Sequence, residues 1–91
     1  MPDNLEYIND GAFFKCKNLI SLEIPKNVKY IYSNVFLNCS SLKKIIFNSI
    51  NTKIHISNKP ILMLIDVYIK QKDKQYIIST DNILFNKMFF D

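Results

Sequence analysis

The sequence predicts an α/β repeat fold, in which each repeat contributes a strand and a helical turn and a strand-rich segment follows. Two observations predict it. The first 47 residues contain the same pattern twice, 23 positions apart, and apolar residues alternate with polar ones where the strands are expected. A fixed period of about 20 to 30 residues is typical of a solenoid, in which each unit completes its core against its neighbours.

The repeat becomes visible when the chain is aligned with itself at a shift of 23 positions. Seven pairs are then identical, and several others keep apolar character. The identical pairs are Pro2/Pro25, Asn4/Asn27, Tyr7/Tyr30, Ile8/Ile31, Phe13/Phe36, Cys16/Cys39 and Leu19/Leu42. Because most matches fall on apolar positions, we expect them to occupy equivalent places in a shared core.

Each repeat contains an alternating segment that predicts a strand. Leu22 and Ile24 are expected to face the core, whereas Ser21 and Glu23 point outward. Pro25 ends this strand because it has no N–H to donate. The second copy, residues 42–47, is expected to place Lys44 and Ile46 outward in the same way.

A short extended step at residues 28–31 precedes one or two helical turns in the second repeat. Asp10 in the first copy and Ser33 in the second stand where an N-cap acceptor is needed. Phe13 and Cys16 are three residues apart, as are Phe36 and Cys39. Residues at this spacing share one face of a helix, and we expect that face to point into the core.

The run Leu-x-x-Ile-x-x-x-Ala-Phe-x-x-Cys-x-x-Leu-x-x-Leu-x-Ile-Pro, from Leu5 to Pro25, resembles the BspA-type leucine-rich repeat, and residues 28–47 repeat it. Two departures occur: Asn9 and Tyr32 stand where the family usually has Gly, and Val35 replaces Ala. The resemblance implies a short leucine-rich-repeat solenoid, with residues 1–47 forming two repeats.

Residues 48–91 are expected to form a degenerate repeat or a hairpin insert. A third copy would place Ala-Phe at positions 58 and 59 and Cys at 62, where the chain has Asn58, Lys59 and Leu62. We therefore predict that strands at residues 53–56, 61–69 and 75–79 replace the helical portion. Residues 70–75 would form a turn or exposed loop. Residues 76–87 are similar to a hairpin insert that BspA-type arrays often carry.

No catalytic, cofactor or metal site is predicted, and the chain is not expected to be an enzyme. Cys16 and Cys39 are expected to be free thiols that fill the core, because equivalent side chains on stacked repeats point in parallel. Two Cys without a nearby His cannot complete a zinc site. His55, the single His, is expected at an exposed or edge position. Gly11 stands alone, so a phosphate-binding loop is not indicated.

The candidate protein-binding face consists of the outward strand positions Ser21, Glu23, Lys44 and Ile46. An exposed branched apolar residue such as Ile46 is unusual on a bare sheet and indicates a contact surface; an inert face is the alternative. The net charge of +4 comes from Lys scattered along a chain without Arg, so nucleic acid is not an expected partner. No apolar stretch approaches the roughly 18 residues that span a bilayer.

The resemblance implies a non-catalytic protein-interaction module, a fragment of a leucine-rich-repeat array from a surface adhesion protein. Family members are often surface or secreted proteins of bacteria and protozoan parasites. Residues 1–4 lack the start of a signal peptide, so the compartment stays open. The alternatives are an intracellular scaffold segment and a degraded repeat copy with no independent function. Both ends are expected to be cut from a longer array, and uncapped ends predict self-association.

Overall fold

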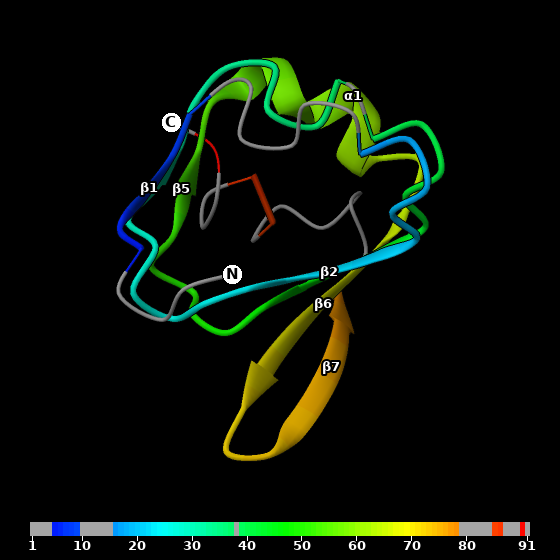
Figure 1. Ribbon diagram of the computed structural model, residues 1–91. Coiled ribbons are helices and arrows are strands. Elements are labelled where there is room, and N and C mark those ends of the chain that lie inside the picture. Colours follow the sequence, from blue (N-terminus) through cyan, green and yellow to red (C-terminus); the bar gives the residue numbers. More distant parts are fainter. Residues whose placement is uncertain (1–4, 10–15, 38, 79–84, 87–89, 91) are drawn as a thin grey trace.

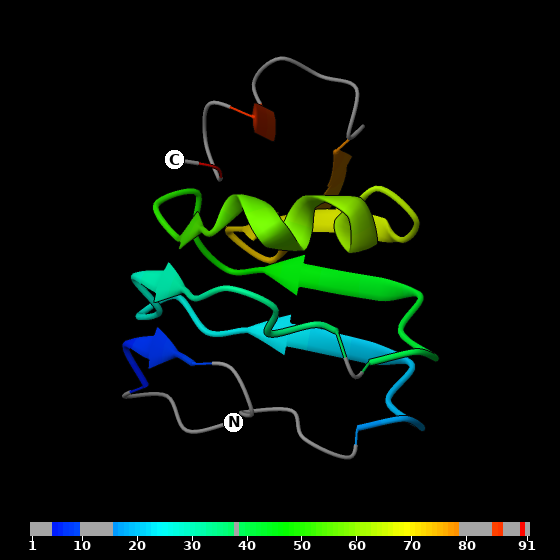
Figure 2. The ribbon, with the colours of Figure 1, turned by 90° about the horizontal axis from the view of Figure 1, so that it is seen from above.

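The computed structural model describes residues 5–9, 16–37, 39–78, 85–86 and 90. Within these residues the chain forms two sheets joined by turns (Figures 1 and 2). One sheet has the order β1-β3-β5, with strands at Tyr7–Ile8, Tyr30–Ile31 and Lys53–Ile54. The other has the order β2-β4-β6-β7, with strands at Ser21–Ile24, Lys44–Phe47, Asp66–Gln71 and Lys74–Ile78.

Parallel pairing stacks three successive units, which Figure 2 shows one above another. Tyr30 pairs with Tyr7 and with Lys53, one full repeat period away in each direction. In the second sheet, Lys44 pairs with Ser21, again one period earlier, and with Asp66, one position short of a full period later. The spacing found in the sequence therefore sets the register of both sheets, and the third unit reaches its strand one residue sooner.

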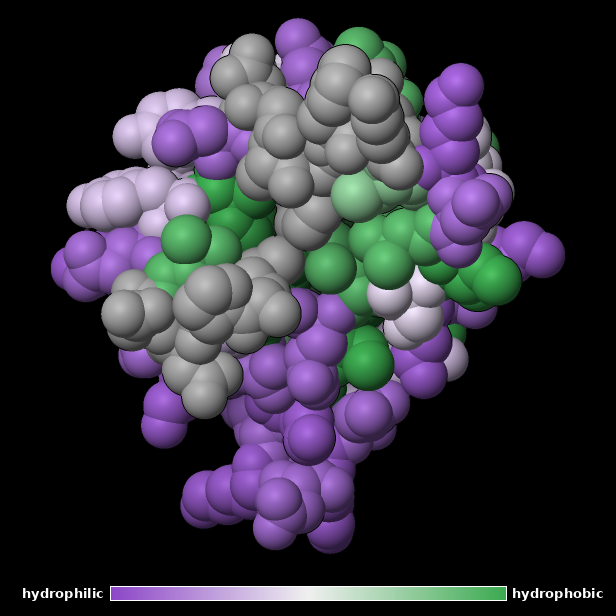
Figure 3. Space-filling view, in the orientation of Figure 1, coloured by the Kyte–Doolittle hydropathy of each residue, from purple (hydrophilic) through white to green (hydrophobic). Residues whose placement is uncertain are grey.

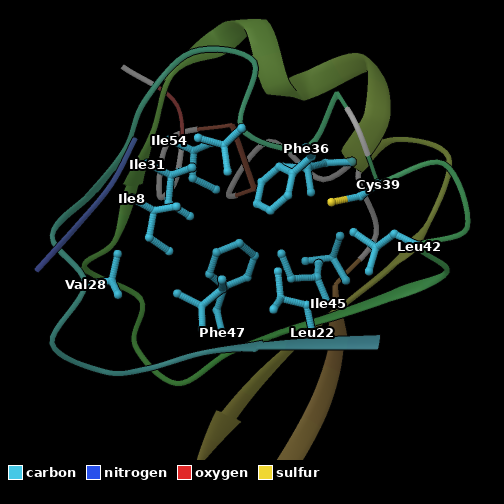
Figure 4. Close-up of a cluster of buried hydrophobic side chains, with 14 of the residues drawn as sticks. Ile8, Leu22, Val28, Ile31, Phe36, Cys39, Leu42, Ile45, Phe47 and Ile54 are labelled. Atoms are coloured by element: carbon cyan, nitrogen blue, oxygen red, sulfur yellow. The ribbon is translucent and has the colours of Figure 1, made fainter. Parts of the chain in front are cut away.

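The core lies between the two sheets and the turns that connect them, where the side chains in Figure 4 converge. As expected, Leu22 and Ile24 are buried while Ser21 and Glu23 are exposed. Phe36 and Cys39 are both buried, which confirms that this pair faces the core. The equivalent Phe13 lies outside the described residues, and Cys16 is only half-buried against the core.

Among the described residues of the second unit, there is no helical turn for Ser33 to cap, contrary to the expectation. Residues 33–37 instead form consecutive turns, one of which is closed by a 3.3 Å hydrogen bond from the Leu37 N–H to the Asn34 carbonyl. Asn34 has a φ of 58°, a left-handed conformation that interrupts a right-handed helix. The corresponding segment of the first unit, including Asp10, lies outside the described residues.

The predicted strands at residues 53–56, 61–69 and 75–79 overlap β5, β6 and β7, but the prediction that strands replace the helical portion of the third unit is wrong. β5 ends at Ile54, and a 3₁₀ helix, η1 (Ile56–Asn58), leads into a short helix, α1 (Lys59–Leu62). Pro60 lies in the first turn of α1, where its fixed φ favours a helix. Leu62 stands one repeat period after Cys39 and is fully buried, so a different residue fills the same place in the core.

Strands β6 and β7 form an antiparallel hairpin that projects away from the body (Figure 1). Its projecting end is hydrophilic (Figure 3). The predicted loop at residues 70–75 is shorter than expected, because pairing continues to Gln71 and Lys74. Lys72 and Asp73 alone make the turn, with φ values of 49° and 67°. Two consecutive positive φ angles are typical of the type I′ turn that closes a two-residue hairpin.

The C-terminal part contributes Phe85 to the core. Its side chain is fully buried, and its ring centroid lies 5.3 Å from that of Phe90. Phe90 forms a parallel bridge with Ile54 of β5. The segment that contains Phe85 lies on the side of the third unit that faces away from the second (Figure 2).

Candidate functional site

The candidate site is the outer face, which we define as the side of the sheet β2-β4-β6-β7 that points away from the core. Strand pairing brings the four predicted residues together on β2 and β4, with Ser21 opposite Lys44 and Glu23 opposite Ile46. The same face continues into the hairpin, since Lys44 pairs with Asp66 and Ile46 with Tyr68. Ile77 in turn lies opposite Tyr68. The residues of the outer face are Ser21, Glu23, Lys44, Ile46, Asp66, Tyr68, Lys70, Gln75 and Ile77.

Exposure divides the predicted residues. Ser21 and Glu23 are exposed and Lys44 is half-buried, but Ile46 is only 8% exposed. The expectation that Ile46 is an exposed apolar residue is therefore wrong, although strand alternation still places it on the outer face. Glu23 and Tyr68 lie beside it on the two neighbouring strands and leave little of it accessible.

Charged side chains of the outer face contact their neighbours across the strands. The Lys44 Nζ lies 4.7 Å from the centroid of the Tyr68 ring, a cation–π arrangement. The Lys70 Nζ lies 3.8 Å from the Glu23 Oε1, and this pair crosses β4, which separates β2 from β6. Both partners remain substantially exposed, so the pair stabilises the fold by about 1 kcal/mol at most. These charges are therefore accessible to a partner.

The β6-β7 hairpin projects from the sheet that forms the outer face. It projects on the side of the sheet opposite the core (Figure 1), at the β6-β7 end of the strand order. A groove of about 800 Å³ opens between the hairpin end and the turns that follow β2 and β4. Its lining residues are Pro25, Lys26, Asn27, Asn48, Lys70, Gln71, Lys72 and Asp73. Lys70 belongs to both the groove and the outer face.

Sequence reasoning missed the hairpin half of this face. Asp66, Tyr68 and Lys70 alternate with Val67 and Ile69, and this alternation is the signal that could have found them. The signal was hidden because the apolar run that starts at residue 61 was assigned to one strand. The structure divides that run between α1 and β6.

The His55, Cys16 and Cys39 side chains have structural contacts. His55 is half-buried and caps η1, with its Nδ1 accepting from the Ser57 N–H at 3.1 Å and lying 2.8 Å from the Ser57 Oγ. Cys16 and Cys39 are free. Burial raises the pKa of the Cys39 thiol, and the neighbouring Cys16 raises it further. Within the described ranges, no three His, Cys, Asp or Glu side chains gather to hold a metal ion.

Comparison with known proteins finds one family. The model of the BspA type leucine rich repeat region (6 copies) matches residues 1–59, which is more than half of the chain. No curated protein and no solved structure matches the chain. Among the residues that the structure describes, no helix has the length and apolar character needed to cross a membrane.

Proposed function

The chain belongs to the BspA-type leucine-rich repeat family, and we propose that it is a non-catalytic protein-interaction module. In this proposal its units form a section of a solenoid, and the outer face binds another protein. Residues 1–47 supply two regular repeats, and residues 48–91 supply a degenerate repeat and a hairpin.

One observation carries the proposal. Sheets of parallel strands normally have both faces covered, yet β2, β4 and β6 pair in parallel and, apart from Ile46, their buried side chains lie on the face toward the core. On the other face Ser21 and Glu23 are exposed, and Lys44 and Lys70 remain partly accessible. A mixed-charge surface with a projecting hairpin at one side can recognise another protein through complementary charges.

Charge reversal on each of the two sheets tests the proposal. The double variant Glu23→Lys/Lys44→Glu alters the outer face and keeps the net charge. Glu6→Lys/Lys29→Glu is the matched control, since these residues form an exposed 3.3 Å ion pair at the other sheet. Immobilised wild-type protein should capture a defined set of proteins from extracts of its source cells, and mass spectrometry identifies them. We expect the outer-face variant to lose this set and the control to retain it; equal behaviour of the two variants, or no capture by wild type, refutes the proposal.

The setting of the interaction is the finer part of the proposal. The family resemblance favours adhesion at a cell surface, and an intracellular scaffold segment is the alternative. Fluorescently labelled protein should bind intact cells in the first case and only permeabilised cells in the second. The Glu23→Lys/Lys44→Glu variant should lose binding in whichever case applies.

A further inference from the structure

The last strand of the second sheet has a free edge. β7 pairs with β6 on one side, and among the described residues no strand pairs with its other side. Its residues 74–77 are all exposed, including Tyr76 at 52% and Ile77 at 63%. An edge strand with exposed apolar side chains is a template for another strand, and natural edges usually carry charges or Pro to prevent this. In β7 only Lys74, next to the turn, is charged.

The turn of the hairpin determines which backbone groups point to this edge. Because Lys72 and Asp73 form a two-residue turn, the flanking residues Gln71 and Lys74 are a hydrogen-bonded pair. Hydrogen-bonded and non-hydrogen-bonded pairs alternate along an antiparallel ladder. Lys74, Tyr76 and Ile78 therefore direct their N–H and C=O groups toward β6. Gln75 and Ile77 direct theirs toward the free edge.

We propose that two copies of this chain pair through β7 in antiparallel orientation, about a two-fold axis at Tyr76. In this register Gln75 of one copy faces Ile77 of the other, and the reverse holds on the other side of the axis. All the free donors and acceptors of Gln75 and Ile77 are then satisfied. The two sheets join into one continuous sheet, and the outer face stays accessible on each copy.

A second copy fits this edge better than an unrelated strand because the edge is complementary to itself. The register that overlaps all five residues of β7 places Lys74 opposite Ile78, so the two Lys74 side chains lie at opposite ends of the interface. Four residues separate them along the ladder, about 14 Å at ordinary strand rise. This exceeds the Debye length of about 8 Å at physiological salt, so their repulsion is screened. The two Tyr76 side chains meet at the centre as a non-hydrogen-bonded pair, the closest kind of cross-strand neighbour.

The dimer should be weak, because a single short strand covers less surface than a standard protein interface. We expect a dissociation constant on the order of 0.1 mM or weaker. Two-fold pairing closes after two copies, whereas pairing of β7 with β2 at the opposite edge of another copy would continue into longer assemblies. Sedimentation velocity at increasing concentration should therefore show monomer and dimer, and growth beyond the dimer would overturn the two-fold arrangement.

Cysteine cross-linking tests the register. In the 91-residue chain with Cys16→Ser, Tyr76→Cys places two thiols at the two-fold axis, and Lys74→Cys places a thiol, also at an exposed position, away from its copy. Under mild oxidation we expect Tyr76→Cys to form covalent dimer at least ten times faster than Lys74→Cys at the same protein concentration. Equal rates, or no dimer from Tyr76→Cys, would refute pairing about Tyr76.

Edge variants test the pairing without a cross-link. Gln75→Pro removes an N–H that points to the free edge and leaves the ladder to β6 intact. Ile77→Lys adds a charge on each copy within the interface. Both should abolish the dimer at concentrations where wild type associates, with circular dichroism confirming that the fold persists. Leu64→Lys is the control, because Leu64 is 85% exposed and lies outside the hairpin. Dimer loss in the control but not in the edge variants would assign association to another apolar surface.

Discussion

Asn58 is a fully buried polar residue that links the third unit to the second. Its Nδ2 donates to the Tyr32 carbonyl at 2.9 Å and to the His55 carbonyl at 3.2 Å, and its Oδ1 accepts from the Phe36 N–H at 3.5 Å. It stands one repeat period after Val35, at the same place in its unit. Asn58 interrupts the repeat pattern of the sequence, and its side chain provides hydrogen-bond partners for backbone groups of the second unit and of His55.

Removal of these hydrogen bonds should destabilise the fold. We expect Asn58→Ala to lower the free energy of unfolding by about 1–3 kcal/mol, because buried backbone groups lose their partners. Asn58→Asp has nearly the same shape but places an acceptor against two carbonyl oxygens, so its loss should be larger at neutral pH. Urea unfolding measures both, with the exposed Asn51→Ala as control. A loss below about 0.5 kcal/mol in Asn58→Ala, the level of a neutral surface change, would contradict this role.

Cys39 should make stability depend on alkaline pH. Burial, and then the neighbouring Cys16, raise its pKa above the ordinary thiol value of 9.0 in the folded chain. The folded state thus holds the thiol proton more tightly than the unfolded state. This contribution to stability is complete below the ordinary pKa and is lost as pH rises through the folded pKa. Urea unfolding at about pH 7 and about pH 10.5 should show a larger decrease for wild type than for Cys39→Ala. Equal decreases would show that Cys39 titrates normally.

The turn of the β6-β7 hairpin contains two residues in an unfavourable conformation. Lys72 and Asp73 both have positive φ, which costs a non-glycine residue about 1 kcal/mol. Replacement by the pair preferred in type I′ turns, Lys72→Asn with Asp73→Gly, should raise the free energy of unfolding by about 0.5–1 kcal/mol. Asn27→Gly is the control, because Asn27 lies in a turn without positive φ and should gain nothing. A gain in the control but not in the hairpin would contradict the turn assignment.

The elements differ in how well the sequence predicts them. Alternation fixed the inward positions Leu22 and Ile24, because a strand buried on one face needs a period of two. The helix α1 was missed because Leu62 replaces Cys at the equivalent position. A search for the motif residues does not detect a different residue that is buried at the same place. Ile46 was placed on the correct side of its strand. One of its two cross-strand neighbours, Tyr68, comes from a hairpin whose pairing partner the sequence does not identify.

In the stack of units, the third unit has a neighbouring unit on one side only among the described residues. Each unit buries its apolar side chains against the next, so the third unit needs cover on the side that faces away from the second. Phe85 supplies part of that cover, since it is fully buried and packs edge-on against Phe90. Phe90 also extends the β1-β3-β5 sheet through its bridge to Ile54. Residues from beyond the hairpin thus complete the core of a unit whose first strand, β5, comes before the hairpin in the sequence.

Substitution of Phe85 should therefore affect the entire fold. We expect Phe85→Ala to lower the free energy of unfolding by about 3–5 kcal/mol, because it removes a buried ring and leaves a cavity beside the third unit. Small domains have only about 5–15 kcal/mol in total, so Phe85→Leu provides a milder variant that should still fold. Thermal and urea unfolding measure both, with Leu64→Ala as control because Leu64 is 85% exposed. If Phe85→Ala lowered the free energy of unfolding no more than this control does, the units would be stable without the C-terminal segment. The Phe85 side chain would then contribute nothing to the stability of the core.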